Sequence, residues 1–174
     1  MIYTLVPLGN KKYTHTRHNS ARVVIDLIKD DINLIQGIEL FTPDTFMNES
    51  GNAVAEYLRY HEGRELIIIY DDKDLAFETF RISHDRGDGG HNGLKSVIDS
   101  IGTKEFIRIR IGIAPHDVDG KVVLSPSGED VQDYVLGKLQ ENEEESLRKI
   151  APDVLGAIKT IVGEGYHKAM ERYN

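Results

Sequence analysis

The sequence predicts an α/β fold, with residues 1–174 forming a single domain on a twisted, mixed but largely parallel sheet flanked by helices. Its 174 residues are enough for one hydrophobic core and few for two domains. Apolar patterns typical of strands and of helices alternate along most of the chain, as in α/β proteins. The run Leu66–Tyr70 is apolar on both faces, which is expected of a central strand covered by helices on each side.

The first half of the chain alternates strands with two predicted helices. A short buried strand is expected at 2–6, and a helix at 19–30 has its apolar residues at three- and four-residue spacing. Residues 32–41 are β-branched and apolar but are interrupted at Gln36-Gly37, so they form either one strand or a tight pair of strands. A second helix is predicted at 50–61.

The second half adds strands at 77–82 and 106–113, with a helix from about residue 94 to 101. Arginine alternates with isoleucine in 106–113, which predicts a strand with one solvent-exposed basic face. Residues 134–137 are interpreted as a short apolar turn. The C-terminal third is helical, and we expect Pro152 in the first turn of a new helix.

Composition restricts the possible functions. The absence of cysteine excludes disulfides, thiolate catalysis and cysteine-ligated zinc. No apolar run approaches the roughly 20 residues that span a bilayer, and the N-terminus lacks a signal-peptide pattern, so we expect a cytoplasmic protein with no membrane partner. The net charge of −8 argues against a general polyanion binder, although basic residues in the middle of the chain allow one local basic patch.

Two stretches suggest acid–base chemistry. His18 lies between a polar loop and a helix start, and an imidazole with a pKa near 6.5 can take a proton from water at neutral pH. The same position also suits a solvated or structural histidine. The central strand is expected to end at Asp71-Asp72, which would place carboxylates at the C-terminal edge of the sheet, where open α/β sheets bind ligands.

Two further loops precede helices. In Pro43–Gly51, Asn48 is either the cap of the following helix or a ligand whose neutral amide both donates and accepts hydrogen bonds. In Gly89–Leu94, the glycines permit positive φ and close approach of a ligand to the backbone. There Asn92 is again a cap or a ligand, and local sequence favours a structural role for His91.

Five blocks, taken in order, resemble bacterial-type peptidyl-tRNA hydrolase. They read TRHN at 16–19, PDTFMNESG at 43–51, GGHNGL at 89–94, RIRIGI at 108–113 and YVLGK at 134–138, and the resemblance extends from Leu8 to Asn174. It implies hydrolysis of the ester that joins a peptide to the 3′-terminal ribose of tRNA. Peptidyl-tRNA is then the partner, no metal or other cofactor is needed, and the protein is expected to be a monomer.

The resemblance also implies roles for individual residues. His18 is the catalytic base and Asp71 orients it. Asn48 is our choice for holding the attacking water or the oxyanion, and direct attack by water is expected because no nucleophilic serine is evident. The substrate-binding set is Asn10, Tyr13, Phe46, Met47, His91 and Asn92, although Met47 is expected mainly to pack beside the site. The expected tRNA phosphate contacts are Arg110 and Lys95.

The chain departs from the family pattern in several places. Lys11-Lys12 replaces the usual Pro-Gly after the loop asparagine. The segment 19–43 is shorter than usual, so a strand of the usual sheet is expected to be missing or reduced. Ser83 stands where a basic residue is common, and Asp88 adds a negative charge beside the cleft. These changes bear on tRNA binding more than on the catalytic group.

Two other functions stay open from the sequence. One is a non-catalytic RNA-binding relative on the same scaffold, and the presence of His18 together with Asp71 speaks against it because binding alone needs no such pair. The other is an esterase that acts on small esters without RNA. Its activity would be independent of salt, whereas binding through phosphate contacts weakens as salt rises.

Overall fold

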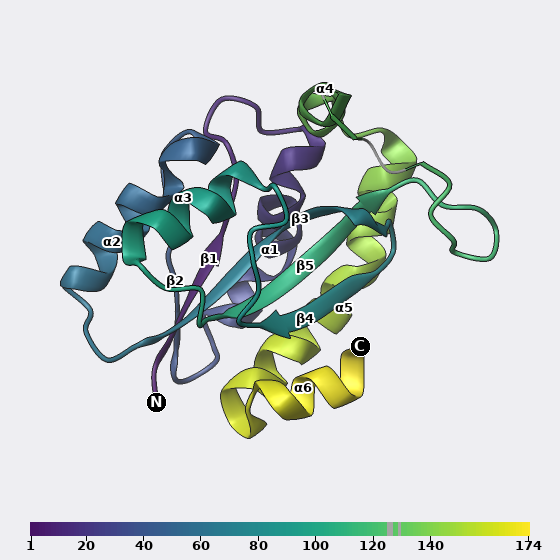
Figure 1. The fold of residues 1–174 in the computed structure, drawn as a ribbon. Coiled ribbons are helices and arrows are strands. Elements are labelled where there is room, and N and C mark those ends of the chain that lie inside the picture. Colours follow the sequence, from purple (N-terminus) through teal and green to yellow (C-terminus); the bar gives the residue numbers. More distant parts are fainter. Residues whose placement is uncertain (125–126, 129) are drawn as a thin grey trace.

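The computed structural model describes residues 1–124, 127–128 and 130–174, and its centre is one five-stranded sheet with strand order β2-β1-β3-β5-β4 (Figure 1). Every neighbouring pair is parallel except β4 and β5, which are antiparallel. The predicted mixed, largely parallel sheet is therefore confirmed. The strands are β1 (Tyr3–Pro7), β2 (Ile38–Leu40), β3 (Glu65–Ala76), β4 (Phe80–His84) and β5 (Ile107–Ala114).

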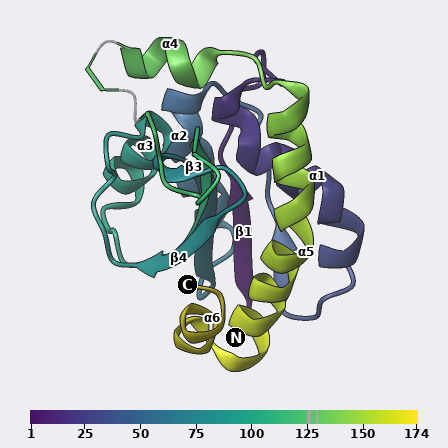
Figure 2. The same ribbon diagram turned by 90° about the vertical axis from the view of Figure 1, so that its right-hand side faces the viewer.

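Helices cover both faces of this sheet, with α1 and α5 on one side and α2 and α3 on the other (Figure 2). The α-helices are α1 (Ser20–Ile32), α2 (Ser50–Arg59), α3 (Asn92–Ile101), α4 (Asp130–Leu136), α5 (Glu141–Glu164) and α6 (Tyr166–Tyr173). Two short 3-10 turns, η1 (Arg17–Asn19) and η2 (Met47–Glu49), lead directly into α1 and α2. No helix in the described part of the chain is both long enough and apolar enough to cross a bilayer.

The central strand β3 divides its side chains between two hydrophobic cores. Ile67 and Ile69 face the core shared with α1 and α5, while Ile68 and Tyr70 face the core shared with α2 and α3. Successive side chains of a strand point to opposite faces, so burial on both faces explains why the run Leu66–Tyr70 is continuously apolar. The prediction of a central buried strand is confirmed.

Several predicted boundaries were wrong. Strand β3 does not end at Asp71-Asp72 but continues to Ala76, with an irregularity in its pairing with β5 after Asp72. The pairing with β5 shifts after Asp72 and resumes where Ala76 lies opposite Ala114, so polar side chains do not end the strand. In the segment 32–41 only Ile38–Leu40 is a strand, and Gly37 at φ +86° lies in the turn before it. The expected strand at 77–82 begins instead at Phe80, because Glu78 adopts φ +64° in a turn.

The C-terminal predictions also need correction. Residues 134–136 form the end of α4 rather than a turn. Pro152 does not begin a new helix, since it lies inside the 24-residue helix α5. Proline removes one helical hydrogen bond, but the buried apolar face on both sides of it, with Ile150 and Val154 in the core, keeps the helix continuous. Packing therefore overrides the local preference.

The approach of α2 to α3 depends on Gly51, and this dependence can be tested. A Cβ at Gly51 would lie 1.9 Å from the backbone oxygen of Ser96. We therefore expect Gly51→Ala to lower the free energy of unfolding by about 1–3 kcal/mol, measured by urea denaturation. The matched control is Gly163→Ala in α5, where an added Cβ meets no atom within 4 Å. This control is expected to gain up to about 1 kcal/mol from helix propensity, and equal stability of the two variants would contradict the packing described.

Candidate active site

A polar cleft of about 930 Å³ opens at the C-terminal end of β1 and along the outer part of β3. This is the edge at which open α/β sheets bind ligands. Five segments far apart in sequence line it: the loop after β1 with η1, the η2 turn, the β3 segment 70–74, the loop before α3, and β5 at Arg110. Residues of α4 close the remaining side.

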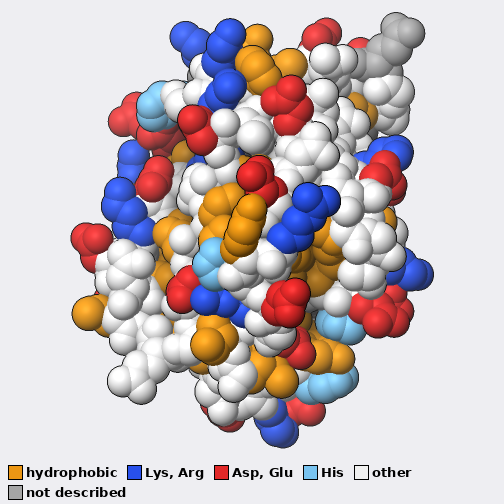
Figure 3. All heavy atoms as spheres, turned by 90° about the vertical axis from the view of Figure 1, so that its left-hand side faces the viewer, with side chains coloured by type: hydrophobic (Ala, Val, Ile, Leu, Met, Phe, Trp, Pro, Cys, Tyr) orange, Lys and Arg blue, Asp and Glu red, His pale blue; other side chains and the backbone are white. Residues whose placement is uncertain are grey.

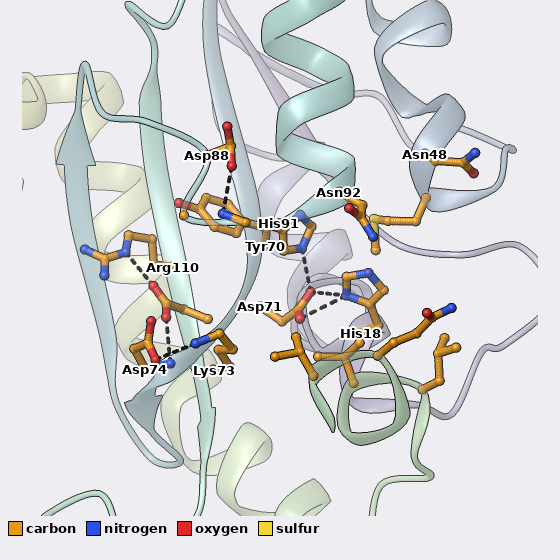
Figure 4. A pocket seen from close by; sticks show the side chains of 18 of the residues that line it. His18, Asn48, Tyr70, Asp71, Lys73, Asp74, Asp88, His91, Asn92 and Arg110 are labelled. Carbon is orange, nitrogen blue, oxygen red and sulfur yellow. Dashed lines mark hydrogen bonds and ion pairs between the residues drawn. The ribbon is translucent and has the colours of Figure 1, made fainter. Parts of the chain in front are cut away.

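His18 and Asp71 form a hydrogen-bonded pair in this cleft (Figure 4). The Nδ1 atom of His18 lies 2.9 Å and 3.0 Å from the two carboxylate oxygens of Asp71. Both side chains are buried, with exposed fractions of 7% for His18 and 3% for Asp71. The expected pairing of these two residues therefore has the required geometry, because the carboxylate accepts the Nδ1 proton and the Nε2 lone pair is left unprotonated.

The position of His18 is set by its neighbour Arg17. The backbone N–H of Arg17 donates to the carbonyl of Gly137 at 3.0 Å, and its Nε donates to Glu143 at 3.1 Å. The guanidinium also lies over the ring of Tyr134, 4.4 Å from the ring centroid. These contacts hold η1 against the segment that joins α4 to α5, so the C-terminal part of the chain fixes the position of His18. Glu143, in the first turn of α5, is the carboxylate partner of Arg17.

Asp71 accepts a second imidazole hydrogen bond, from His91. The Nε2 of His91 lies 2.9 Å from Asp71 Oδ1, and its Nδ1 accepts the backbone N–H of Leu94 at 3.1 Å. Because Nδ1 is an acceptor, the ring proton is on Nε2 in this arrangement. His91 is therefore the cap of α3. Of the two roles left open for Asn92, helix cap or ligand, the structure thus excludes the cap. Sequence reasoning had suggested a structural role for His91 but not its bond to Asp71.

The electrostatics of the pair favour a basic histidine. Burial lowers the pKa of His18. The charge and hydrogen bond of Asp71 raise this pKa by more than burial lowers it, so the pKa of His18 lies above its usual value. For Asp71, burial acts in the other direction and raises the pKa. The two imidazoles nevertheless hold the pKa of Asp71 well below the usual range of a carboxyl group. Asp71 consequently stays ionised at neutral pH and stabilises a proton on His18.

His18, Asp71 and His91 are also the kinds of residue that bind metals, and their ligand atoms lie within 4.8 Å of one another. In this arrangement, however, each imidazole nitrogen facing Asp71 carries the proton of a hydrogen bond, and a metal would have to displace both protons. The three groups satisfy one another without an ion. A reaction that needs no metal stays a prediction.

Asn10 is held at the cleft by Asn19, a residue that sequence reasoning had not assigned. The backbone N–H of Asn10 donates to Asn19 Oδ1 at 2.7 Å, and Asn19 Nδ2 donates back to the carbonyl of Asn10 at 3.0 Å. Both residues are buried. The only sequence signal for this role was that Asn19 completes the block at 16–19. The replacement at Lys11-Lys12 leaves Asn10 in the lining of the cleft.

The remaining substrate-binding candidates are placed differently from one another. Asn48 and Asn92 are exposed and line the cleft, and the amide of Asn48 points away from His18 in Figure 4. Asn48 makes no capping hydrogen bond at the start of α2, so the cap alternative is not realised. Met47 is buried at 4% exposure and packs in the core beside the cleft, as expected. Tyr13 lines the cleft, whereas Phe46 lies outside the lining.

The two expected phosphate contacts also differ. Arg110 lines the cleft, and its Nε donates to Asp72 at 2.8 Å, which orients the guanidinium (Figure 4). Lys95 is exposed outside the lining and pairs with Asp99 one helical turn away. Asp88 lies in the lining and accepts the backbone N–H of Gly90, so its negative charge faces the cleft as expected.

The prediction of a solvent-exposed basic face on β5 was wrong, because Arg108 is completely buried. Its guanidinium donates to the carbonyls of Arg86, Gly87 and Lys104 and lies 4.6 Å from the centroid of the Phe106 ring. A buried guanidinium needs such acceptors. Arg108 thereby holds the loop that carries His91, a role that no local sequence pattern reveals.

An α/β fold in which a buried histidine–aspartate pair faces an open cleft is typical of an enzyme that uses general acid–base catalysis. Comparison with known proteins specifies the family. The family model for peptidyl-tRNA hydrolase matches residues 4–174. The peptidyl-tRNA hydrolase of Fervidobacterium nodosum is 39% identical, covering 98% of this chain and 94% of that protein, and that of Chloroflexus aggregans is 35% identical, covering 99% of both.

Solved structures agree with the sequence comparison. An arginine-to-glutamine variant of peptidyl-tRNA hydrolase from Acinetobacter baumannii superimposes with a TM-score of 0.84 at 29% identity, over 99% of this chain and 94% of that one. The chain therefore belongs to the peptidyl-tRNA hydrolase family. This confirms the resemblance inferred from the five sequence blocks.

The effect of Asp71 on His18 can be measured without substrate. In Asp71→Asn the charge that raises the pKa of His18 is lost while its burial remains, so we expect that pKa to fall. An NMR titration of the His18 ring follows the change. The control, Asp99→Asn, removes an exposed carboxylate that pairs with Lys95, and it should leave the His18 titration where it is. An unchanged His18 pKa in Asp71→Asn would show that the pair does not act as described.

Proposed function

We propose that this protein hydrolyses the ester bond of peptidyl-tRNA and that His18, held by Asp71, is the general base. The observation that carries the proposal is the fixed orientation of His18, whose Nδ1 is bonded to a buried carboxylate at the edge of an open cleft. Membership of the peptidyl-tRNA hydrolase family supplies the reaction and the substrate. The product would be free peptide and reusable tRNA.

The reaction follows from this orientation. His18 Nε2 takes a proton from a water molecule, and the water oxygen attacks the ester carbonyl to give a tetrahedral oxyanion. Asp71 stabilises the imidazolium that forms. The intermediate then expels the ribose oxygen, which receives the proton from His18, so that the base is regenerated. General base catalysis of this kind contributes about 10²–10⁴-fold to the rate.

The amides of Asn48 and Asn92 are our candidates for stabilising the oxyanion or holding the water. Their support is their place on the lining of the cleft and the freedom of both side chains from helix capping. Asn48 would have to turn toward His18 when substrate binds. Loss of one oxyanion donor typically costs about 2.7–4 kcal/mol of transition-state stabilisation.

Binding of the substrate would use both ends of the cleft. Asn10, which is hydrogen-bonded to Asn19 beside His18, is proposed to contact the peptide or the terminal nucleotide. Tyr13 and Met47 are proposed to border the same region. Arg110, oriented by Asp72, is the proposed phosphate contact. The position of Lys95 outside the lining and its pairing with Asp99 give it a weaker claim to that role.

We also propose that the protein works as a monomer in the cytoplasm. The support for a monomer is that the helices of this chain cover both faces of its own sheet. The support for the location is the substrate, because peptidyl-tRNA arises where ribosomes translate. A single elution volume in size-exclusion chromatography, matching 19.6 kDa, would agree with the first part.

The assignment of the base is tested by His18→Ala. We expect kcat for peptide release to fall by about 10²–10⁴-fold, since the group that activates water is lost, while binding of the tRNA is retained. Peptide release is measured with an N-blocked aminoacyl-tRNA. The control, His61→Ala, removes a half-buried ring that stacks on Tyr57 at the end of α2, and it should keep wild-type turnover.

The outcomes separate the competing functions. Unchanged turnover in His18→Ala would overturn the base assignment. Binding of tRNA without any peptide release by the wild-type protein would favour a non-catalytic RNA-binding role. A protein that hydrolyses small esters at a rate independent of salt, and that does not hydrolyse peptidyl-tRNA, would be a general esterase.

A further inference from the structure

The loop between Asn10 and Tyr13 carries two lysines that meet at one aromatic ring. The Nζ atoms of Lys11 and Lys12 lie 5.0 Å and 5.3 Å from the centroid of the Phe46 ring. Both lysines are exposed, and Phe46 is half-buried. Adjacent residues of an extended loop normally project in different directions, so the convergence of two ammonium groups on one ring is a specific arrangement of this chain.

Neither lysine has an acidic partner among the residues that the structure describes. Within the described ranges, Lys11 and Lys12 form no ion pair, whereas six other lysines pair with carboxylates: Lys29, Lys73, Lys95, Lys104, Lys149 and Lys168. The whole chain has a net charge of −8, and Lys11 and Lys12 are two adjacent cations without such a pair. Their mutual repulsion is unfavourable in the free protein and would be relieved by a bound anion.

The lysines lie at the mouth of the cleft. Their sequence neighbours Asn10 and Tyr13 both line it. The loop is fixed on both sides, because the N–H of Lys11 donates to the carbonyl of Thr45 at 3.2 Å and the N–H of Lys12 donates to Asn10 Oδ1 at 3.2 Å. Basic side chains beside apolar ones are visible at the top of the face in Figure 3, the end of the molecule where Figure 1 shows the loop after β1.

The opposite part of the cleft carries acidic and basic side chains in equal number. Asp72, Asp74 and Asp88 lie in its lining, with Lys73, Arg86 and Arg110 between them. Two of these basic residues pair with acidic ones: Arg110 donates to Asp72, and Lys73 pairs with Asp74. Lys11 and Lys12 therefore add two positive charges to a cleft whose opposite part is balanced in charge.

We propose that Lys11, Lys12 and Phe46 form a subsite for the phosphodiester groups of the single-stranded nucleotides that precede the ester. The two ammonium groups would bind one or two phosphates, and the Phe46 ring would keep both lysines at the mouth through cation–π contacts. Because Asn10 lies in the same loop, a phosphate held there would fix the direction from which the terminal ribose reaches His18. This inference rests on the proposed function and extends it to a binding site specific to this chain.

The test compares the double variant Lys11→Gln/Lys12→Gln with wild type on an N-blocked aminoacyl-tRNA over a range of salt concentrations. We expect KM to rise on the order of 10-fold near physiological salt, and the slope of log KM against log salt to fall by about 0.7 for each lost phosphate contact. Turnover at saturation should stay at the wild-type value because neither lysine contacts the reacting atoms. Phe46→Leu should raise KM in the same direction.

The matched control is Lys121→Gln/Lys159→Gln, which changes the net charge equally at two exposed lysines outside the cleft lining. Its salt slope and KM should remain at the wild-type values. A second substrate, a blocked aminoacyl ester of a free nucleoside, has no phosphodiester. On that substrate the Lys11→Gln/Lys12→Gln variant should match wild type.

Failure of the inference can be distinguished from failure of the proposed function. A wild-type protein that releases no peptide from either substrate overturns the proposed function. An active wild type with the same KM and salt slope in the Lys11→Gln/Lys12→Gln variant overturns the inference alone. The inference is also overturned if that variant loses as much on the phosphate-free ester, because the lysines would then contact the nucleoside or the peptide.

Discussion

The site depends on one buried carboxylate that accepts hydrogen bonds from two imidazoles. Burial raises the pKa of Asp71, but the charges and hydrogen bonds of the two imidazoles lower it by more, so the carboxylate stays ionised. The same two bonds determine which nitrogen of each ring carries the proton. The Nδ1 of His91 already accepts a backbone N–H, so His18 is the ring of this pair with a nitrogen left to take a proton from water.

The fold supplies these three groups from distant segments. Asp71 comes from the outer part of the central strand, His18 from the turn before α1, and His91 from the turn before α3. Two arginines hold the turns in place. Arg17 forms hydrogen bonds between η1 and the segment after α4, and the buried Arg108 donates hydrogen bonds to the loop before α3. The chemistry of the cleft thus depends on contacts between residues far apart in sequence: Arg108 and Gly87 are 21 positions apart, and Arg17 and Glu143 are 126 positions apart.

Much of the architecture was predictable because it follows local rules. The buried run Leu66–Tyr70, the helical spacing of α1 and α3, and the strand–helix alternation all depend on neighbouring residues. The errors arose where tertiary contacts decide: Pro152 is tolerated inside α5 by packing, and Arg108 is buried because backbone carbonyls surround it. The pairing of His18 with Asp71 was expected from the family resemblance, whereas the bonds made by Asn19, Arg17 and His91 are long-range contacts without a sequence pattern of their own.

The central claim is that His18, with a pKa raised by Asp71, is the base that activates water. The most direct measurement is kcat/KM for peptide release as a function of pH, compared with the pKa of His18 from NMR titration of the same wild-type protein. The account predicts that kcat/KM falls as pH decreases through one ionisation, that this kinetic pKa coincides with the NMR value, and that both lie above the value of about 6.5 for an unperturbed histidine. A rate that stays constant through the titration of His18 would contradict it.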